Sequence, residues 1–124
     1  MLSTATIEAT IANLYRALGD RPTFDAHLDP QLTMWESDEP ALMRGLAPLD
    51  ALRDRRSVTT TVPPVSVAPE ELLVSQWGET GLARYVLRAR YDDGRPDDCF
   101  RVTDVLRRGA DGWRIVHHHS EALR

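Results

Sequence analysis

Three β-rich segments fill the second half of the chain and are separated by short polar turns. The segments 82–91, 99–108 and 113–120 are rich in β-branched, aromatic and alternating residues, and the turns DDGRPDD and RGADG lie between them. This pattern predicts a three-stranded antiparallel meander. The stretch 59–77 is also β-rich, but prolines at 63, 64 and 69 interrupt it, which is typical of an edge or bent strand.

The first third of the chain predicts helices. Ser3 or Thr4 can cap a helix that carries an apolar stripe and ends at Gly19. A short helix capped by Thr23 is expected at 23–28, a strand at 31–37 and a third helix at 48–56. Because a helix with one apolar stripe needs a sheet to cover it, residues 1–124 predict a single domain.

Composition removes several function classes. All fifteen basic residues are arginine, so a Schiff-base lysine and a phosphate-loop lysine are excluded. Cys99 is the only cysteine, which excludes an internal disulfide and a cysteine-rich zinc site. The net charge of −4 argues against a nucleic-acid or membrane-surface partner. Without a signal segment or a long apolar run, the chain is expected to be cytoplasmic.

Strand alternation sorts the predicted meander into two faces, provided that no bulge shifts the register. One face is nearly all apolar, and the other carries a band of arginines. The apolar face comprises Ala83, Tyr85, Leu87, Ala89, Phe100, Val102, Leu106, Trp113, Ile115, His117 and His119. The arginine face comprises Arg84, Val86, Arg88, Arg90, Arg101, Thr103, Val105, Arg114, Val116, His118 and Ser120. Either the arginines lie in water, or their face lines a pocket for a carboxylate or phosphate.

The run DGWRIVHHHS, preceded by FRVTDVLRR, resembles the C-terminal strand pair of the nuclear-transport-factor-2-like superfamily. The nearest branches are the SnoaL-like group and the association domain of calcium/calmodulin-dependent protein kinase II. The resemblance covers nearly the whole chain, since LGDRPTFDAHLDPQLTMWESD and the later RGL occur in matching order. It implies an α+β cone, in which a curved antiparallel sheet wraps around a long N-terminal helix, accompanied by two shorter helices.

The resemblance also implies a pocket and a homodimer formed through the sheet. In the kinase association domain, arginines on three neighbouring strands line the pocket. Their positions fall here near Val86 or Arg88, on Thr103 with Arg101 one step along, and near Ser120. We therefore expect Arg88, Arg101, Thr103 and Ser120 to bind a small organic ligand, expected to be anionic.

Two residues are candidates for acid–base chemistry. His118 lies on the arginine face, and an unperturbed histidine titrates near neutrality. Tyr15 lies on the first helix, where a tyrosine of ketosteroid isomerase, a catalytic relative with this fold, donates to the developing oxyanion. That chemistry also needs a carboxylate base, and Asp104 falls on the face opposite the arginines.

Other residues carry weaker hypotheses. His117 and His119 point the same way, but no third ligand is spaced to complete a metal site with them, so neither a metal nor a cofactor is expected. Trp35 is expected to wall an apolar pocket, although core packing would explain it equally.

Two functions remain open. The first is a cofactor-free acid–base enzyme of the isomerase, cyclase or hydrolase kind. The second is a non-catalytic ligand-binding or oligomerisation module like the kinase association domain. A pocket-facing acid or histidine with a perturbed pKa would favour the enzyme, whereas arginines without a paired base would favour binding alone.

Overall fold

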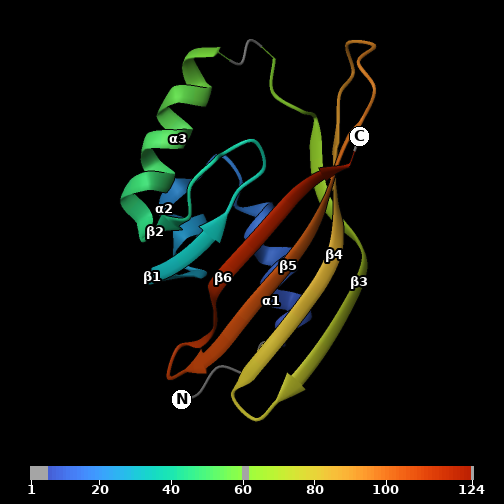
Figure 1. Ribbon diagram of the computed structural model, residues 1–124. Coiled ribbons are helices and arrows are strands. Elements are labelled where there is room, and N and C mark those ends of the chain that lie inside the picture. The colour runs from blue at the N-terminus through green and yellow to red at the C-terminus, as the bar shows by residue number, and fades with distance from the viewer. Residues whose placement is uncertain (1–5, 60–61, 124) are drawn as a thin grey trace.

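The computed structural model describes residues 6–59 and 62–123 and contains one six-stranded sheet flanked by three helices (Figure 1). The elements in chain order are α1 (Ile7–Arg16), α2 (Arg21–Asp25), β1 (Leu28–Trp35), β2 (Met43–Arg44), α3 (Leu46–Thr59), β3 (Ser66–Trp77), β4 (Thr80–Arg90), β5 (Asp98–Gly109) and β6 (Gly112–Leu123). The sheet order is β2-β1-β6-β5-β4-β3. The predicted meander is therefore confirmed as β4-β5-β6, with β3 paired along its outer edge.

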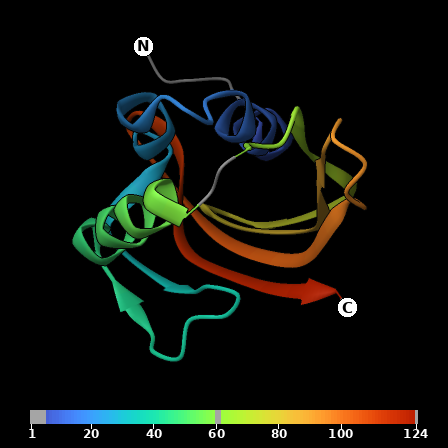
Figure 2. The ribbon, with the colours of Figure 1, turned by 90° about the horizontal axis from the view of Figure 1, so that it is seen from above.

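The sheet is strongly curved, and all three helices lie on its concave side (Figure 2). This arrangement confirms the expected α+β cone. Two details differ from expectation: α1 has 10 residues and is shorter than α3, which has 14, and the β1–β6 pair is parallel whereas the other pairs are antiparallel. No helix within the described ranges has the length and apolar character needed to cross a bilayer.

The helix caps lie close to the expected positions. Thr6 caps α1 by accepting a hydrogen bond from the Ala9 amide at 3.0 Å, whereas the expected caps Ser3 and Thr4 lie outside the described residues. Asp20, not Thr23, caps α2. The Asp20 carboxylate accepts from both the amide and the hydroxyl of Thr23, and a carboxylate at this position also complements the helix dipole.

The core lies between α1 and the concave face of the sheet. Ile7, Ile11 and Leu14 form the buried stripe of α1. Leu32 and Met34 lie on the same face of β1, as strand alternation requires, and this face is the buried one. From the meander, the concave face contributes Ala83, Tyr85, Ala89, Val102, Asp104, Leu106, Trp113 and Ile115, all of them buried.

A β-bulge in β6 changes which histidine faces inward. Leu106 pairs with Ile115 and Val105 pairs with His117, so Val116 is an extra residue in the ladder. An extra residue inverts the alternation beyond it. The expected assignment of the three histidines was therefore wrong: His118 and Ser120 join the concave face, and His117 and His119 join the convex face.

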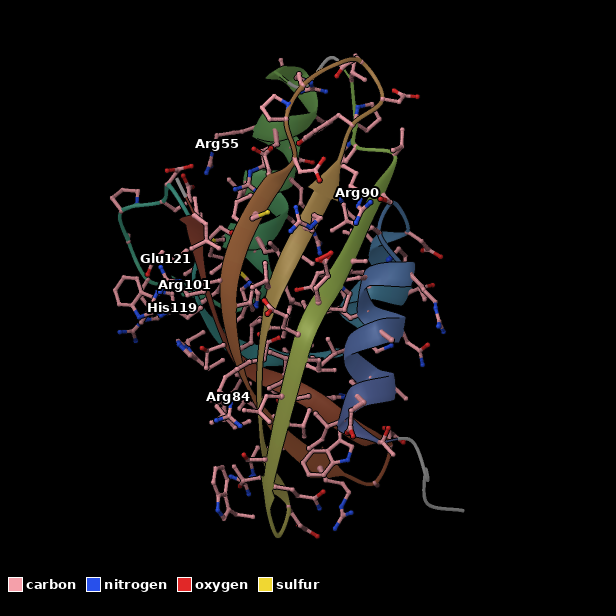
Figure 3. All side chains as sticks on the ribbon, turned by 90° about the vertical axis from the view of Figure 1, so that its right-hand side faces the viewer. Arg55, Arg84, Arg90, Arg101, His119 and Glu121 are labelled. Carbon is pink, nitrogen blue, oxygen red and sulfur yellow. The ribbon has the colours of Figure 1, made fainter. Side chains whose placement is uncertain are left out.

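The convex face carries the arginines. Figure 3 shows Arg84, Arg101, His119 and Glu121 on the side of the sheet away from α1. Of the two expectations for the sheet faces, the first is correct, because the apolar face packs on the helices and the arginine face points outward.

Candidate functional site

A cavity of about 400 Å³ opens between the concave face and the helices. Its walls are largely apolar and come from all three helices and most strands. They include Leu14, Leu18, Phe24, Leu28, Met34, Leu49, Leu52, Val67, Leu87, Ala89, Phe100 and Ile115. Its polar lining comprises Tyr15, Glu36, Ser37, Asp38, Arg53, Arg56, His118 and Ser120. This mixture, apolar walls with a few polar groups, is typical of a site for a small organic molecule.

The polar groups are organised around a buried carboxylate. Asp104 on β5 is fully buried, and each of its oxygens meets a different partner. His118 Nδ1 lies 2.5 Å from Oδ1, and the hydroxyl of Tyr85 donates to Oδ2 at 2.5 Å. The hydroxyls of Tyr85 and Tyr15 are in turn 2.6 Å apart. Four side chains from α1, β4, β5 and β6 thus form one hydrogen-bonded chain, of which only Tyr15 and His118 line the cavity.

The two ring nitrogens of His118 differ in their hydrogen bonding, because only Nδ1 contacts Asp104. Because an ionised carboxylate only accepts, Nδ1 carries a hydrogen and donates to Asp104. No described residue is hydrogen-bonded to Nε2, and the side chain, which lines the cavity, is 12% exposed. Nε2 is therefore the ring nitrogen of His118 that is left for a ligand.

The surroundings of His118 favour its charged form. Burial is the largest influence and by itself lowers the pKa of the imidazole. The attraction of Asp104, the hydrogen bond to it and the attraction of Glu36 together outweigh burial, so the pKa of His118 is raised above its ordinary value. His118 therefore keeps its proton to a higher pH than an ordinary histidine does.

The two tyrosines stay protonated. Burial, followed by the charge of Asp104, raises the pKa of Tyr15 well above its usual value. Burial and the neighbours Tyr15 and Asp104 raise the pKa of Tyr85 in the same direction. Both phenols are consequently neutral hydrogen-bonding groups and not bases.

The segment 36–38, directly after β1, contributes to the polar lining of the cavity. Ser37 is buried, and its hydroxyl lies 3.2 Å from that of Ser120 on β6. The negative charge of Glu36 contributes to raising the pKa of both Tyr15 and His118. Further back, Arg53 on α3 donates to both oxygens of Asp25, at 2.7 and 3.1 Å, so part of its charge is already paired within the protein.

The expected arginine site is not formed. Arg88 donates to Glu70 at 2.9 and 3.0 Å and to Asp97 at 3.2 Å, and Arg101 lies 3.4 Å from Glu121. Both arginines and Thr103 lie on the convex face, because their alternation is opposite to that of Asp104. The expectation that they share a face with His118 and Ser120 was wrong, since the bulge at Val116 turns His118 and Ser120 to the concave face and leaves the residues of β4 and β5 where alternation puts them.

Trp35 and the outer histidines also lie away from the cavity. Trp35 is 42% exposed, because Met34 takes the inward position on β1; it borders a second hollow of about 410 Å³ together with His119 and Glu121. His117 contacts the hydroxyl of Thr33 through Nδ1 at 2.7 Å. Within residues 6–59 and 62–123, no group of three or more His, Cys, Asp or Glu side chains is arranged to hold a metal.

Sequence reasoning missed Tyr85, Asp104 and Glu36 as members of the site. A signal for the first two was present, since each places a polar group on an otherwise apolar strand face, and a buried polar group is more informative than a buried apolar one. Glu36 carried no such signal, because it follows the strand and its position depends on the course of the loop.

A curved sheet that encloses a cavity beside a helix is the architecture of a class of small α+β cone domains, and here buried, hydrogen-bonded polar side chains reach that cavity. A model of the SnoaL-like domain family matches residues 7–122, and the chain belongs to this family. None of the curated proteins matches the sequence.

Solved structures share the fold at low sequence identity. An NTF2-like protein of unknown function from Pseudomonas putida is 24% identical, with a TM-score of 0.81 over 99% of this chain and 90% of its own. The CaMKII hub of S. rosetta is 22% identical, with a TM-score of 0.77 over 94% of each chain. A candidate ketosteroid isomerase from Parabacteroides distasonis is 17% identical, with a TM-score of 0.71 over 100% of this chain and 96% of its own. At these identities the likeness concerns the fold alone.

Proposed function

We propose that this chain is a cofactor-free acid–base enzyme of the isomerase, cyclase or hydrolase kind, acting on a small organic compound. The observation that carries the proposal is the His118–Asp104 pair, in which His118 lines the cavity and its Nε2 is left for a ligand. A histidine oriented by a carboxylate behind it is a common arrangement for proton transfer.

Each member of the site has a role in this proposal. Asp104 fixes the tautomer of His118 and stabilises the imidazolium. His118 donates a proton from Nε2 to a basic atom of the substrate and, once neutral, takes a proton from an acidic C–H or O–H group at the same nitrogen. Glu36, which also lines the cavity, favours the protonated form of His118. The apolar walls exclude water, which strengthens these interactions.

The expectation of an anionic ligand loses its main support. It rested on Arg88 and Arg101, which form ion pairs on the convex face. The cavity itself contains two acidic residues, Glu36 and Asp38, beside Arg53 and Arg56. We therefore propose a mainly apolar, uncharged substrate.

A proton-exchange assay tests the catalytic proposal. 2-Tetralone in D₂O is a suitable probe, because its size suits the cavity and deuterium uptake at its acidic C–H positions reports proton abstraction by mass spectrometry. The wild type is expected to exceed the buffer rate, and His118→Asn to reduce the enzymatic rate by about 10²-fold or more. Arg101→Ala, on the convex face, is the matched control and is expected to retain the wild-type rate. Equal rates for wild type and His118→Asn would reject catalysis by His118.

A homodimer through the convex face is the second part of the proposal. Trp35, Leu73 and Trp77 are exposed by 42, 59 and 62%, and β-sheet faces with large exposed apolar side chains are favoured as interfaces. The fold is shared with two structures named as CaMKII hub or hub-homology domains, which supports self-association. If His118→Asn proves to have no effect, a ligand-binding or oligomerisation module remains the alternative.

A further inference from the structure

The direction of the hydrogen bonds in the chain from Tyr15 to His118 determines which ligand groups the cavity recognises. Asp104 accepts at both oxygens, from His118 and from Tyr85. A tyrosine has a single hydroxyl hydrogen, and that of Tyr85 is used on Asp104. The 2.6 Å contact between the two phenols must therefore use the hydrogen of Tyr15.

Tyr15 consequently has no hydrogen left for a ligand. Its oxygen offers only a lone pair to any further partner, as long as Asp104 is ionised. This is the opposite of the expectation that Tyr15 donates to a developing oxyanion. His118 offers a hydrogen on Nε2 when it is charged, and its raised pKa extends the pH range of this form.

We infer that Tyr15 and His118 in the cavity lining bind a neutral hydroxyl group, such as that of a phenol, enol or alcohol. This inference rests on the proposed function, because it assigns the substrate class of the same cavity. A hydroxyl can donate its hydrogen to the oxygen of Tyr15 and can accept a hydrogen from Nε2 of charged His118, so it suits both groups of the cavity lining. A carbonyl oxygen or an ether accepts but cannot donate, and its lone pairs meet the lone pairs of Tyr15.

The burial of Tyr15 strengthens the argument. Only 8% of this residue is exposed, so water offers its oxygen little compensation when a ligand fills the cavity. An unsatisfied polar contact in such an environment weakens binding by more than the bond itself contributes. The preference for a hydroxyl is therefore expected to be measurable.

Three naphthalenes of similar shape test the inference by calorimetry at neutral pH. 2-Naphthol donates and accepts, whereas 2-methoxynaphthalene and 2-acetylnaphthalene only accept. The wild type is expected to bind 2-naphthol about tenfold more tightly than either of the others. 2-Methoxynaphthalene is more apolar than 2-naphthol, so hydrophobic burial alone would make the ether bind more tightly. Tighter binding of 2-naphthol would therefore have to come from its hydroxyl group.

Two variants identify the acceptor. Tyr15→Phe is expected to weaken 2-naphthol binding to the level of the ether and to leave the ether unchanged. Tyr85→Phe frees the hydrogen of Tyr15 and is expected to tighten 2-acetylnaphthalene binding several-fold, by about the value of one hydrogen bond. Arg101→Ala is expected to leave all three affinities unchanged.

The result that overturns the inference is equal or tighter binding of the ketone by the wild type, together with its loss in Tyr15→Phe. Tyr15 would then be a donor, and Asp104 would carry a proton on Oδ2. Deuterium exchange into 2-tetralone is measured independently of these affinities. A preference for the hydroxyl compound without deuterium exchange therefore rejects the proposed catalysis and supports the inference. Deuterium exchange without this preference supports the catalysis and rejects the inference.

Discussion

His118 and Asp104 face each other across the β5–β6 ladder, with Nδ1 of the imidazole 2.5 Å from Oδ1 of the carboxylate. The carboxylate is completely buried, and the imidazole is the only one of the two that lines the cavity. Removing either partner leaves the other buried and incompletely paired, which is the costly outcome for such a pair. The pair therefore links the stability of the domain to the charge of its candidate catalytic group.

The stability of the wild type is expected to depend on pH through His118. Because the folded-state pKa of His118 is raised, mainly by Asp104 against the opposing effect of burial, the folded state binds this proton more tightly than the unfolded state does. The resulting stabilisation is complete below the ordinary pKa of about 6.5 and is lost as pH rises through the higher folded-state value. Each tenfold difference in proton affinity between the two states contributes about 1.4 kcal/mol to the free energy of unfolding.

Urea unfolding of wild type and His118→Asn between about pH 5.5 and 8.5 measures this contribution. The stability advantage of the wild type over the variant is expected to shrink as pH rises. A difference that stays constant across this range would show that the pKa of His118 is not raised.

Arg101→Ala is expected to change little. The Arg101–Glu121 pair lies at 3.4 Å with side chains 66 and 60% exposed, and exposed pairs typically contribute between about 0 and 1 kcal/mol. The free energy of unfolding should shift by no more than about 0.5 kcal/mol, and the affinity for 2-naphthol should stay the same. A loss of affinity for small carboxylates in this variant, compared with their neutral esters, would restore the arginine-lined pocket.

Gly81→Ala is expected to destabilise the domain. A Cβ atom at this position of β4 would overlap the Cδ1 atom of Ile7 on α1 and would lie 3.4 Å from the ring of Trp113. Ile7 is itself buried, so the overlap forces a shift at the helix–sheet contact, at about 1–3 kcal/mol. Gly109→Ala, where nothing lies within 4 Å, is the matched control; similar losses for both variants would contradict a close approach at Gly81.

The chain is expected to sediment as a dimer of about twice its mass of 14.0 kDa. A stable sheet-to-sheet interface buries at least about 1,200 Å² in total. Trp77→Ser with Leu73→Lys removes two of the exposed apolar side chains of β3 and is expected to shift the equilibrium to monomers. Sedimentation of the wild type at the monomer mass at micromolar concentration would reject the dimer.

The fold was predictable because its signals are local. The turns around 92–98 and 109–112 set the limits of the meander, and alternation within it separated the buried face from the arginine face over β4 and β5. The same alternation also separated Asp104 correctly from the arginines. The site was not predictable to the same extent, because one residue decides it: the bulge at Val116 carries no distinctive sequence signal, yet it exchanges His117 for His118 on the concave face.

The role of Asp104 shows the second limit. Its position among Val102 and Leu106 on a buried face was evident from the sequence, but its partners belong to three other elements. Tyr85, His118 and, through Tyr85, Tyr15 reach it only in the folded sheet. Long-range convergence of this kind depends on sheet curvature and register, which periodicity does not specify.

Titration of the His118 ring by NMR tests the central claim most directly. In the wild type, the imidazole is expected to titrate above about 6.5, the ordinary value for histidine. In Asp104→Asn, burial remains while the favourable charge is lost, so the pKa of His118 is expected to fall below that value. A His118 ring that titrates at or below its ordinary value in the wild type, and that is unaffected by Asp104→Asn, would contradict the account.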